Sequence, residues 1–375
     1  MKIGLDLINL SSLADGMGRF AGQLVSGLSQ MDRENKYFLF LNAQISGDFG
    51  VGTGQFKILK IRVPRKRMLP WNQVYFLSLS WALPPLDILH SPVSLSPLVI
   101  LRRLKKIVTV HDLAFKLFPE TASRKSLLWW NSAWPLCLKN VDHIVADSQN
   151  TKRDLRTFYN VDENKVSVVY PYSSISAASV ADDTLALLRS KYNLPDRFLL
   201  FVGAPHKRKN IDSLIQGFHI FKHATALPHK LVLVGPKGWA LESLVAQIKR
   251  LRLEDDVLIT GFVTDGDMAI FYRAAELLIY PSFYEGFGYP PLEAMTMGAP
   301  VLMARTSSLP EVGGDAAVYI DPFSPADMAE KLERVIRDVE GSNDLRSRGR
   351  ERAGQFNMAR TIRGYLDVYQ RVSAA

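Results

Sequence analysis

The sequence predicts an α/β protein with two domains, each built on a doubly wound parallel sheet. The chain has 375 residues and 47% apolar content, which is enough for two domains with separate cores. Short apolar strands alternate with helical segments along both halves, as is typical of parallel sheets covered by helices. Many of these strands end in Gly, Pro, Asp or His, the residue types expected at the binding edge of such a sheet.

We expect the first domain over residues 1–175 and the second over 191–355, with a linker over 176–190. The linker is expected because residues 173–183 are small, polar and without periodicity. The only cysteine, Cys137, lies in an apolar stretch, so it has no partner in this chain for a disulfide and favours a buried hydrophobic role.

The first predicted strand, residues 2–8, leads into Gly16-Met17-Gly18-Arg19 and then into apolar residues at helical spacing. A strand, a glycine loop and a helix in this order can cradle a phosphate, but a tight turn into a helix has the same pattern. The other strands of this half are predicted at 37–41, 56–63, 87–89, 107–110, 143–146 and 166–170.

Three of these strands end in polar residues, before His90, before His111-Asp112 and before Asp147-Ser148. Ligands bind beyond the carboxyl ends of strands in open α/β sheets, so the three ends can reach one crevice. His111 is the best candidate for a binding residue. A lone histidine is more often a hydrogen-bonded core residue, which is our interpretation of His143, and His90 stays undecided.

The second half alternates more regularly. Strands are predicted at 198–202, 231–234, 257–260, 277–280, 301–303 and 318–320, with helices at 212–223, 240–251, 267–275 and 325–339. The first strand leads into Lys207-Arg208-Lys209, three cations before a helix. Such a cluster suits a phosphate clamp, although a solvated basic turn would look the same.

The stretch from Leu277 to Arg305 predicts a buried strand, a glycine turn, a short helix and a second strand. Pro290 and Pro291 suit a first helical turn, and Gly298 suits its C-terminal cap. Glu285 and Glu293 should face the crevice, beside N–H groups and a helix dipole that favour an anion. An anion cradle with two hydroxyl acceptors is the chemistry that a sugar nucleotide requires.

The string EGFGYPPLEAM followed by GAPV resembles the E-x7-E signature of family 4 of the retaining glycosyltransferases. GMGRF, VHDL and a VGxxxxRKN segment are similar to other motifs of that family, and the resemblance covers nearly the whole second half. It implies the GT-B fold, two Rossmann-like domains facing a cleft. It also implies that residues 356–375 form a C-terminal helix that crosses back to the first domain.

The resemblance implies roles for individual residues. Lys209, Arg208 and the amides of Gly16 and Gly18 would bind the diphosphate of a nucleotide-sugar donor. Glu285 would hold the hexose hydroxyls, Glu293 the ribose hydroxyls and His111 the hexose 6-OH. Further donor-binding positions would be Gly203, Val263, Gly286, Phe287 and Gly288.

The resemblance leans toward GDP-mannose as donor and toward surface polysaccharide or O-antigen synthesis, with no separate cofactor. Two departures stand out. Ala204 occupies a position where many relatives have Arg, and VVYPYSSIS replaces their VPNGVD segment.

Asp265-Gly266-Asp267 has the form of a motif that holds a metal ion on a sugar diphosphate. It directly precedes a predicted helix, where an Asp is a good N-cap. We therefore expect capping, no metal site and metal-independent transfer.

The net charge of +9 is uneven, because residues 1–190 contain 23 Lys and Arg against 15 Asp and Glu. Arg62–Arg67 and Arg102–Lys106, with Trp71, Tyr75 and Trp81, would suit an anionic membrane surface, although a solvated basic face fits equally well. No apolar stretch is long enough to span a membrane, so we expect a cytoplasmic enzyme, peripheral at most, acting on a saccharide or lipid-linked saccharide acceptor.

Two other functions are compatible with parts of this pattern. A GT-B epimerase or a nucleotide-sugar hydrolase could share the phosphate clamp. A basic nucleic-acid-binding protein is weaker, because Glu285 and Glu293 would repel a phosphate backbone. We therefore expect no nucleic-acid partner.

Overall fold

The computed structural model describes residues 1–10, 12, 16–45, 49–52, 54–62, 84–93, 104–121, 124–175, 184–236 and 241–374. The chain divides into two compact units, Met1–Tyr172 with Asn357–Ala375, and Ser173–Phe356. From the sequence, the corresponding divisions are expected at residues 175 and 355. Both units contain an entirely parallel sheet, which confirms the predicted α/β class.

The sheet of the first unit has the order β3-β2-β1-β4-β5-β6-β7. Its strands are β1 (Lys2–Leu7), β2 (Lys36–Asn42), β3 (Phe56–Ile61), β4 (Ile88–Ser91), β5 (Lys105–Val110), β6 (His143–Ala146) and β7 (Val166–Val168). The helices are α1 (Gly16–Met31), α3 (Ala114–Leu117), α4 (Arg124–Asn140), α5 (Gln149–Tyr159) and α14 (Met358–Ala374), with 3-10 turns η2 (Pro119–Thr121) and η3 (Glu163–Lys165).

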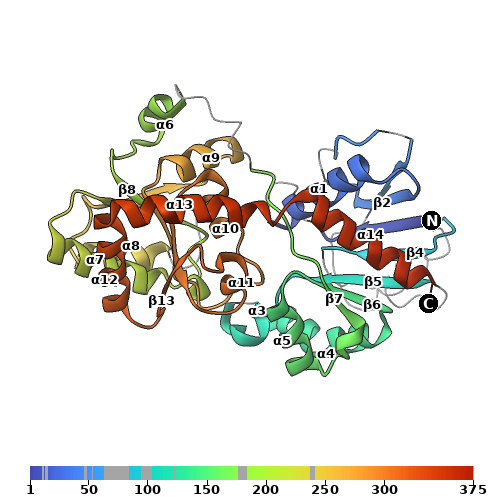
Figure 1. The fold of residues 1–375 in the computed structure, drawn as a ribbon. Coiled ribbons are helices and arrows are strands. Elements are labelled where there is room, and N and C mark those ends of the chain that lie inside the picture. The colour runs from blue at the N-terminus through green and yellow to red at the C-terminus, as the bar shows by residue number, and fades with distance from the viewer. Residues whose placement is uncertain are drawn as a thin grey trace. The chain divides into compact units, whose positions relative to one another are not determined.

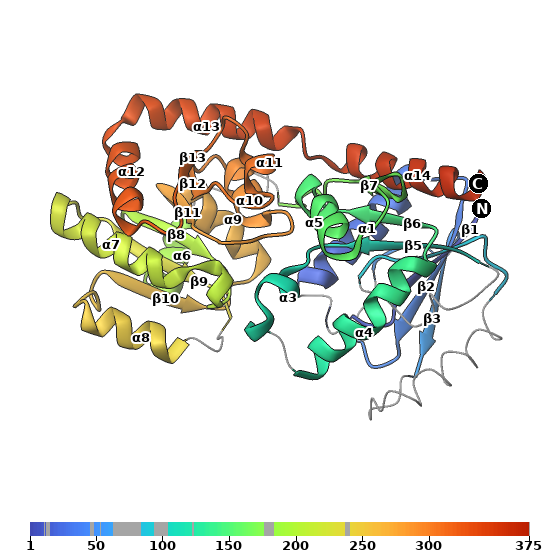
Figure 2. The same ribbon diagram turned by 90° about the horizontal axis from the view of Figure 1, so that it is seen from below.

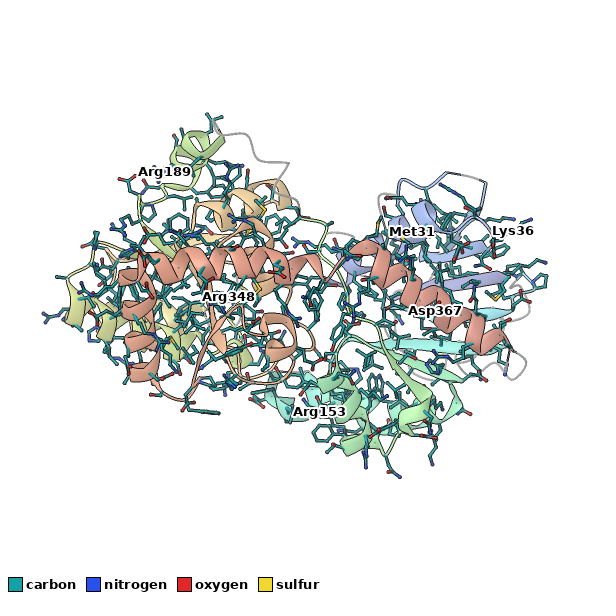
Figure 3. The ribbon with its side chains drawn as sticks, in the orientation of Figure 1. Met31, Lys36, Arg153, Arg189, Arg348 and Asp367 are labelled. Atoms are coloured by element: carbon teal, nitrogen blue, oxygen red, sulfur yellow. The ribbon has the colours of Figure 1, made fainter. Side chains whose placement is uncertain are left out.

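Helix α14 completes the core of the first unit, although it comes from the other end of the chain. It packs beside α1, as both ribbon views show (Figures 1 and 2). Its buried face consists of Thr361, Ile362, Tyr365, Val368, Tyr369 and Val372. Asp367 lies on the exposed side of the helix (Figure 3). Thr361 Oγ1 donates to the Tyr170 carbonyl at 2.8 Å, so the helix is also fixed by polar contacts.

The sheet of the second unit has the order β10-β9-β8-β11-β12-β13. Its strands are β8 (Phe198–Val202), β9 (Lys230–Val234), β10 (Val257–Gly261), β11 (Leu277–Tyr280), β12 (Val301–Ala304) and β13 (Val318–Ile320). The helices are α6 (Thr184–Tyr192), α7 (Ile211–Thr225), α8 (Leu241–Arg250), α9 (Asp265–Ala274), α10 (Tyr289–Met297), α11 (Leu309–Gly313), α12 (Pro325–Arg337) and α13 (Val339–Gly354), with the 3-10 turn η5 (Lys207–Lys209).

The direction of strand connection reverses between β8 and β11, which are neighbours in this sheet. Helices α7 and α8 lie on one side of the sheet, and α9, α10 and α11 on the other (Figure 2). The loops after β8 and β11 therefore lead from the same carboxyl edge to helices on opposite sides of the sheet, as in other doubly wound sheets.

The expected linker, 176–190, overlaps a helix. Residues 184–190 belong to α6, which buries Leu188 and is tied to α9 through Asp267. Asp267 accepts from Lys191 Nζ and from the Tyr192 hydroxyl, both at 2.7 Å. Arg189 of the same helix, labelled in Figure 3, pairs with Asp196 at 3.2 Å. Because α6 makes these contacts, it is a structured part of the second unit and the linker assignment is wrong for this stretch.

No helix in the described part of the chain is long and apolar enough to span a membrane. The aromatic residues Trp71, Tyr75 and Trp81 and the cations Arg65–Arg67, Arg102 and Arg103 lie outside the described residues.

Candidate functional site

The main candidate site lies at the carboxyl ends of β8 and β11 in the second unit. The loop after β8 forms the turn η5 and carries Arg208 and Lys209, and the loop after β11 carries Glu285. The two loops are joined by a backbone hydrogen bond of 2.8 Å from Phe283 N to the Arg208 carbonyl. The topological switch point of this sheet, between β8 and β11, thus brings together cations and a carboxylate that are far apart in sequence.

Glu285 forms two short ion pairs. Arg208 Nη1 lies 2.6 Å from one carboxylate oxygen and Lys209 Nζ 2.6 Å from the other, and the Glu285 side chain is 8% exposed. Lys209 Nζ also lies 2.5 Å from the Tyr280 hydroxyl and above the Tyr280 ring. Two cations and one carboxylate leave a net positive charge at this edge of the sheet.

Glu285 is held in its ionised form. Burial alone would raise the pKa of its carboxyl group, but the charges of Lys209 and Arg208 outweigh burial and lower the pKa to about 2. A carboxylate that stays charged near neutral pH can accept hydrogen bonds from hydroxyl groups, but it is not a general acid there.

Three hydroxyl side chains after β12 fix the backbone of the Glu285 loop. Ser307 Oγ accepts from Glu285 N at 2.9 Å, and Thr306 Oγ1 donates to the Ser282 carbonyl at 2.8 Å. The buried Ser308 hydroxyl lies 2.9 Å from the Glu285 carbonyl and 2.7 Å from the Phe287 carbonyl. We did not predict this hydroxyl clamp, Thr306–Ser308, from the sequence, although a run of three hydroxyl residues directly after a strand was the available signal.

The glycine turn and α10 follow Glu285 as predicted. Gly288 has φ 126°, which disfavours any side chain, and Gly298 caps the helix with φ 82°. The Phe287 ring is buried against Tyr289 and Phe356, so only the backbone of Phe287 remains for a ligand.

Glu293 lies in the first half of α10 and is half-buried. Its carboxylate accepts from the Tyr272 hydroxyl at 2.8 Å and lies 3.4 Å from Ser173 Oγ. These contacts involve both oxygens of the carboxylate, one each. Glu285 is held by cations instead, so the two glutamates have different surroundings.

Gly203 lines a cavity of about 170 Å³ at the carboxyl ends of β8, β9 and β10. Its walls are largely apolar and include Phe201, Leu233, Leu244 and Ile259. Gly235 is needed at this edge, because a Cβ there would lie 2.2 Å from the Gly203 carbonyl oxygen. Val263, just after β10, is 3% exposed.

The Asp265-Gly266-Asp267 segment does not cap α9 in the predicted way. Thr264 is the N-cap residue, and its hydroxyl accepts from Asp267 N at 3.4 Å. Asp265 and Asp267 instead occupy the first helical turn, where the helix dipole favours negative charge, and Asp267 binds Lys191 and Tyr192. Among the described residues, no group of three or more His, Cys, Asp or Glu side chains is arranged to hold a metal ion.

The first unit contains a second candidate site around His111, at the carboxyl end of β5. His111 Nδ1 lies 2.6 Å from an Asp147 carboxylate oxygen, and Nε2 lies 2.9 Å from the Pro92 carbonyl. Phe20 of α1 contacts the imidazole edge to face at 4.6 Å. The sequence predicts Gly16 and Gly18 in a loop before the helix, but they form the first turn of α1, the helix that contacts His111 through Phe20.

The other two histidines of this sheet are structural. His90 is fully buried between the Tyr369 hydroxyl and Thr109 Oγ1, both at 2.8 Å, and burial lowers its pKa to about 3. His143 is 5% exposed and bonds Ser167 Oγ at 2.8 Å; burial and nearby cations lower its pKa to about 4. The structure thus decides the question about His90 in favour of a core role.

Two family profiles match this chain. The profile "Glycosyltransferase Family 4" matches residues 14–172, and "Glycosyl transferases group 1" matches residues 188–352. Together they cover most of both units. The epimerase, hydrolase and nucleic-acid-binding alternatives are not favoured by these matches.

Two individual proteins that are similar to this chain are also glycosyltransferases by name. The chain is 29% identical over 296 residues to the O-antigen chain mannosyltransferase B of Escherichia coli, which covers 78% of this chain and 76% of that protein. It is 28% identical over 262 residues to the O-antigen chain mannosyltransferase RfbU of Salmonella typhimurium, covering 69% and 68%.

Among solved structures, sucrose-phosphate synthase from Thermosynechococcus elongatus aligns with a TM-score of 0.79 at 19% identity. The alignment covers 100% of this chain and 99% of that one, and it supports the GT-B fold. With a parallel α/β sheet in each unit and a family profile matched in each, the chain belongs to the group 1 glycosyltransferases of family 4.

Proposed function

We propose that this enzyme transfers a hexose from a nucleotide diphosphate sugar to a saccharide acceptor with retention of anomeric configuration and without a metal ion. The observation that carries the proposal is the Arg208–Lys209–Glu285 cluster at the topological switch point of the second sheet, between β8 and β11. In doubly wound sheets this is the position at which nucleotides bind.

Lys209 and Arg208 are proposed to stabilise the negative charge that develops on the departing diphosphate. Both cations are largely shielded from solvent, at 12% and 22% side-chain exposure, so their interaction with a phosphate is weakly screened. Because side chains supply this charge, a metal ion is not needed for the step. The amides of Gly16 and Gly18 are proposed as further diphosphate ligands.

Glu285 is proposed to accept hydrogen bonds from hexose hydroxyls, and Glu293 from the ribose. Glu285 suits this role because it is ionised and because the hydroxyl clamp fixes its backbone. The carboxylates would be positioning groups, unlike the acid and nucleophile of a glycosidase. The departing diphosphate itself would help to take the acceptor proton.

The donor is proposed to be GDP-mannose. Two curated relatives that align over most of this chain are named O-antigen mannosyltransferases, and this supports the choice of mannose. The apolar cavity beside Gly203 is proposed to receive the base, since flat aromatic rings favour such walls. Val263, Gly286, Phe287 and Gly288 are proposed as further donor contacts, the last three through backbone groups.

The acceptor is proposed to be a growing saccharide in surface polysaccharide or O-antigen synthesis, carried on a lipid at the cytoplasmic face of the membrane. The names of the relatives support the first part, and the excess of Lys and Arg in residues 1–190 supports the second.

Binding and product analysis test the proposal. Isothermal titration with GDP-mannose, UDP-glucose, UDP-galactose and UDP-N-acetylglucosamine should give the tightest binding for GDP-mannose. Transfer to a saccharide acceptor should persist in EDTA and give an α-linked product. Inactivity in EDTA that Mn²⁺ restores would overturn metal independence, and tighter binding of a UDP sugar would overturn the donor assignment.

A further inference from the structure

The imidazole of His111 lies between two hydrogen-bond acceptors. On one side is the Asp147 carboxylate, 2.6 Å from Nδ1, and on the other is the Pro92 carbonyl oxygen, 2.9 Å from Nε2. A backbone carbonyl carries no proton. An ionised carboxylate carries none either, so each ring nitrogen must supply its own.

This arrangement determines the protonation state of the ring. A neutral imidazole has one N–H and one lone pair, and its lone pair would face an acceptor in either tautomer. Only the imidazolium donates to both partners. The Asp147 side chain is 4% exposed, and its second oxygen has no hydrogen-bond partner within the described ranges. Among the described residues, His111 is therefore the cation that compensates the charge of this buried carboxylate.

The other groups around the ring agree with a charged state. Asp112 adds a second negative charge, and Phe20 from α1 contributes an uncharged edge. His90 on β4 does not oppose the charge, because burial lowers its pKa to about 3 and keeps it neutral. Tyr365 of α14 interacts with Asp147 and stays neutral, because burial raises its pKa well above the usual value. Burial lowers the pKa of His111, but Asp147 and the hydrogen bonds to Asp147 and Pro92 outweigh burial and raise it.

We infer that Asp147 is a positioning residue that keeps His111 protonated and in one orientation. Both N–H groups of His111 are used by Asp147 and Pro92, so the ring offers a substrate its positive charge, and it is not a general base. In the proposed reaction, on which this role rests, the positive charge of His111 would favour the negatively charged donor. Asp147 would act only through the ring.

NMR titration of the histidine side chains in the free, full-length protein tests the charge state. Both ring nitrogens of His111 should remain protonated at pH 7, whereas His90 and His143 should be neutral in the same spectra. A neutral His111 at pH 7 would overturn the inference. This readout requires no donor or acceptor, so it is independent of the proposed function.

Two aspartate variants test whether Asp147 is what keeps His111 protonated. In Asp147→Asn the pKa of His111 should fall, and the ring should become neutral near pH 7. Asp142→Asn is the matched control, because Asp142 is a carboxylate of the same unit that pairs with Lys105 and not with His111. It should leave the His111 titration unchanged. Cooperative urea unfolding near the wild-type midpoint would show that each variant is folded, and an unchanged His111 pKa in folded Asp147→Asn would refute the role of Asp147.

The pH profile of transfer extends the test to function. Asp147→Asn should approach wild-type kcat/KM at low pH and lose activity as pH rises through the lowered pKa of His111. His111→Gln keeps a donor but no charge, and it should lose about 10- to 100-fold at every pH. Parallel profiles for Asp147→Asn and the wild type would contradict the inference. Absence of transfer from every donor would count against the proposed function instead, and the titration would still decide the charge state.

Discussion

At the scale of single residues, the second unit holds opposite charges close together in a largely buried cluster, Arg208, Lys209 and Glu285. The Glu285 side chain is 8% exposed, and each of its oxygens is paired with a cation. Removing one partner of such a group costs more than removing both, because a buried charge is left with less compensation. Substitutions here should therefore affect binding and stability to different extents.

Lys209→Ala should weaken GDP-mannose binding by about 10- to 100-fold, the range expected for a lost charged hydrogen bond. Lys207→Ala is a matched control, because Lys207 lies in the same turn η5 but is exposed. Isothermal titration of both variants checks the prediction. Equal affinities in the two variants would remove Lys209 from the donor site.

The free energy of unfolding should fall as the pH drops from about 4.5 toward 2. The pKa of Glu285 is depressed in the folded protein, so its contribution is complete above the unfolded pKa and is lost through the folded value of about 2. The contribution is on the order of 3 kcal/mol. Urea unfolding at pH 5 and pH 3 measures it. Glu285→Gln should show a smaller loss between these pH values, and an identical loss would contradict the prediction.

At the scale of elements, one buried side chain joins three loops of the second unit. Asn210 connects η5 to α7 with φ 57°, and its side-chain amide donates to the carbonyls of Pro281, at 3.1 Å, and Pro322, at 2.7 Å. The loops after β8, β11 and β13 are thus held together next to Lys209. Asparagine suits the position because it tolerates the left-handed backbone and supplies two donors.

Asn210→Ala should lower the free energy of unfolding by about 2 to 4 kcal/mol, since two buried carbonyls lose their donor. Asn193→Ala measures the cost of the left-handed backbone alone, because Asn193 has φ 53° and an exposed side chain. Denaturant unfolding of both variants gives the difference. Similar losses would assign the effect to the backbone and not to the loop connection.

The strands were predictable because buried parallel strands are continuous apolar runs, such as Leu277–Tyr280. Helix α13 was missed because its sequence has almost no apolar stripe, and only Leu345, Gly349 and Ala353 are buried. The candidate site was predictable as a set of polar strand ends. Its pairings, such as Glu285 with Lys209 and His111 with Asp147, depend on which strands are neighbours, and strand order is not encoded locally.

At the scale of the whole molecule, the two units differ in how the chain builds them. The second unit is one continuous segment, Ser173–Phe356. The first requires both Met1–Tyr172 and Asn357–Ala375, and α14 contributes Ile362, Tyr365, Val368, Tyr369 and Val372 to its core. A buried hydrogen bond between His90 of β4 and the Tyr369 hydroxyl of α14 also joins the two segments.

Residues 173–356 expressed alone should fold cooperatively and bind the donor, because their core is complete. Residues 1–172 alone should remain largely unfolded, and addition of a 357–375 peptide should restore cooperative unfolding. Circular dichroism with thermal melting checks both fragments, and a peptide with Ile362, Tyr365 and Tyr369 replaced by Ser is the control. A cooperative melt of 1–172 without peptide would show that α14 is dispensable.

The discontinuity of the first unit also sets an order of events on the ribosome. The strands of its sheet are made first, but α14 emerges only after a further 203 residues, from 173 to 375, have been added. At about 5 to 20 residues per second this takes roughly 10 to 40 s. During that time the second unit can complete its fold while the apolar surface reserved for α14 stays uncovered. The nascent first unit is therefore the expected client of ribosome-associated chaperones, and the synthesis of α14 decides when that need ends.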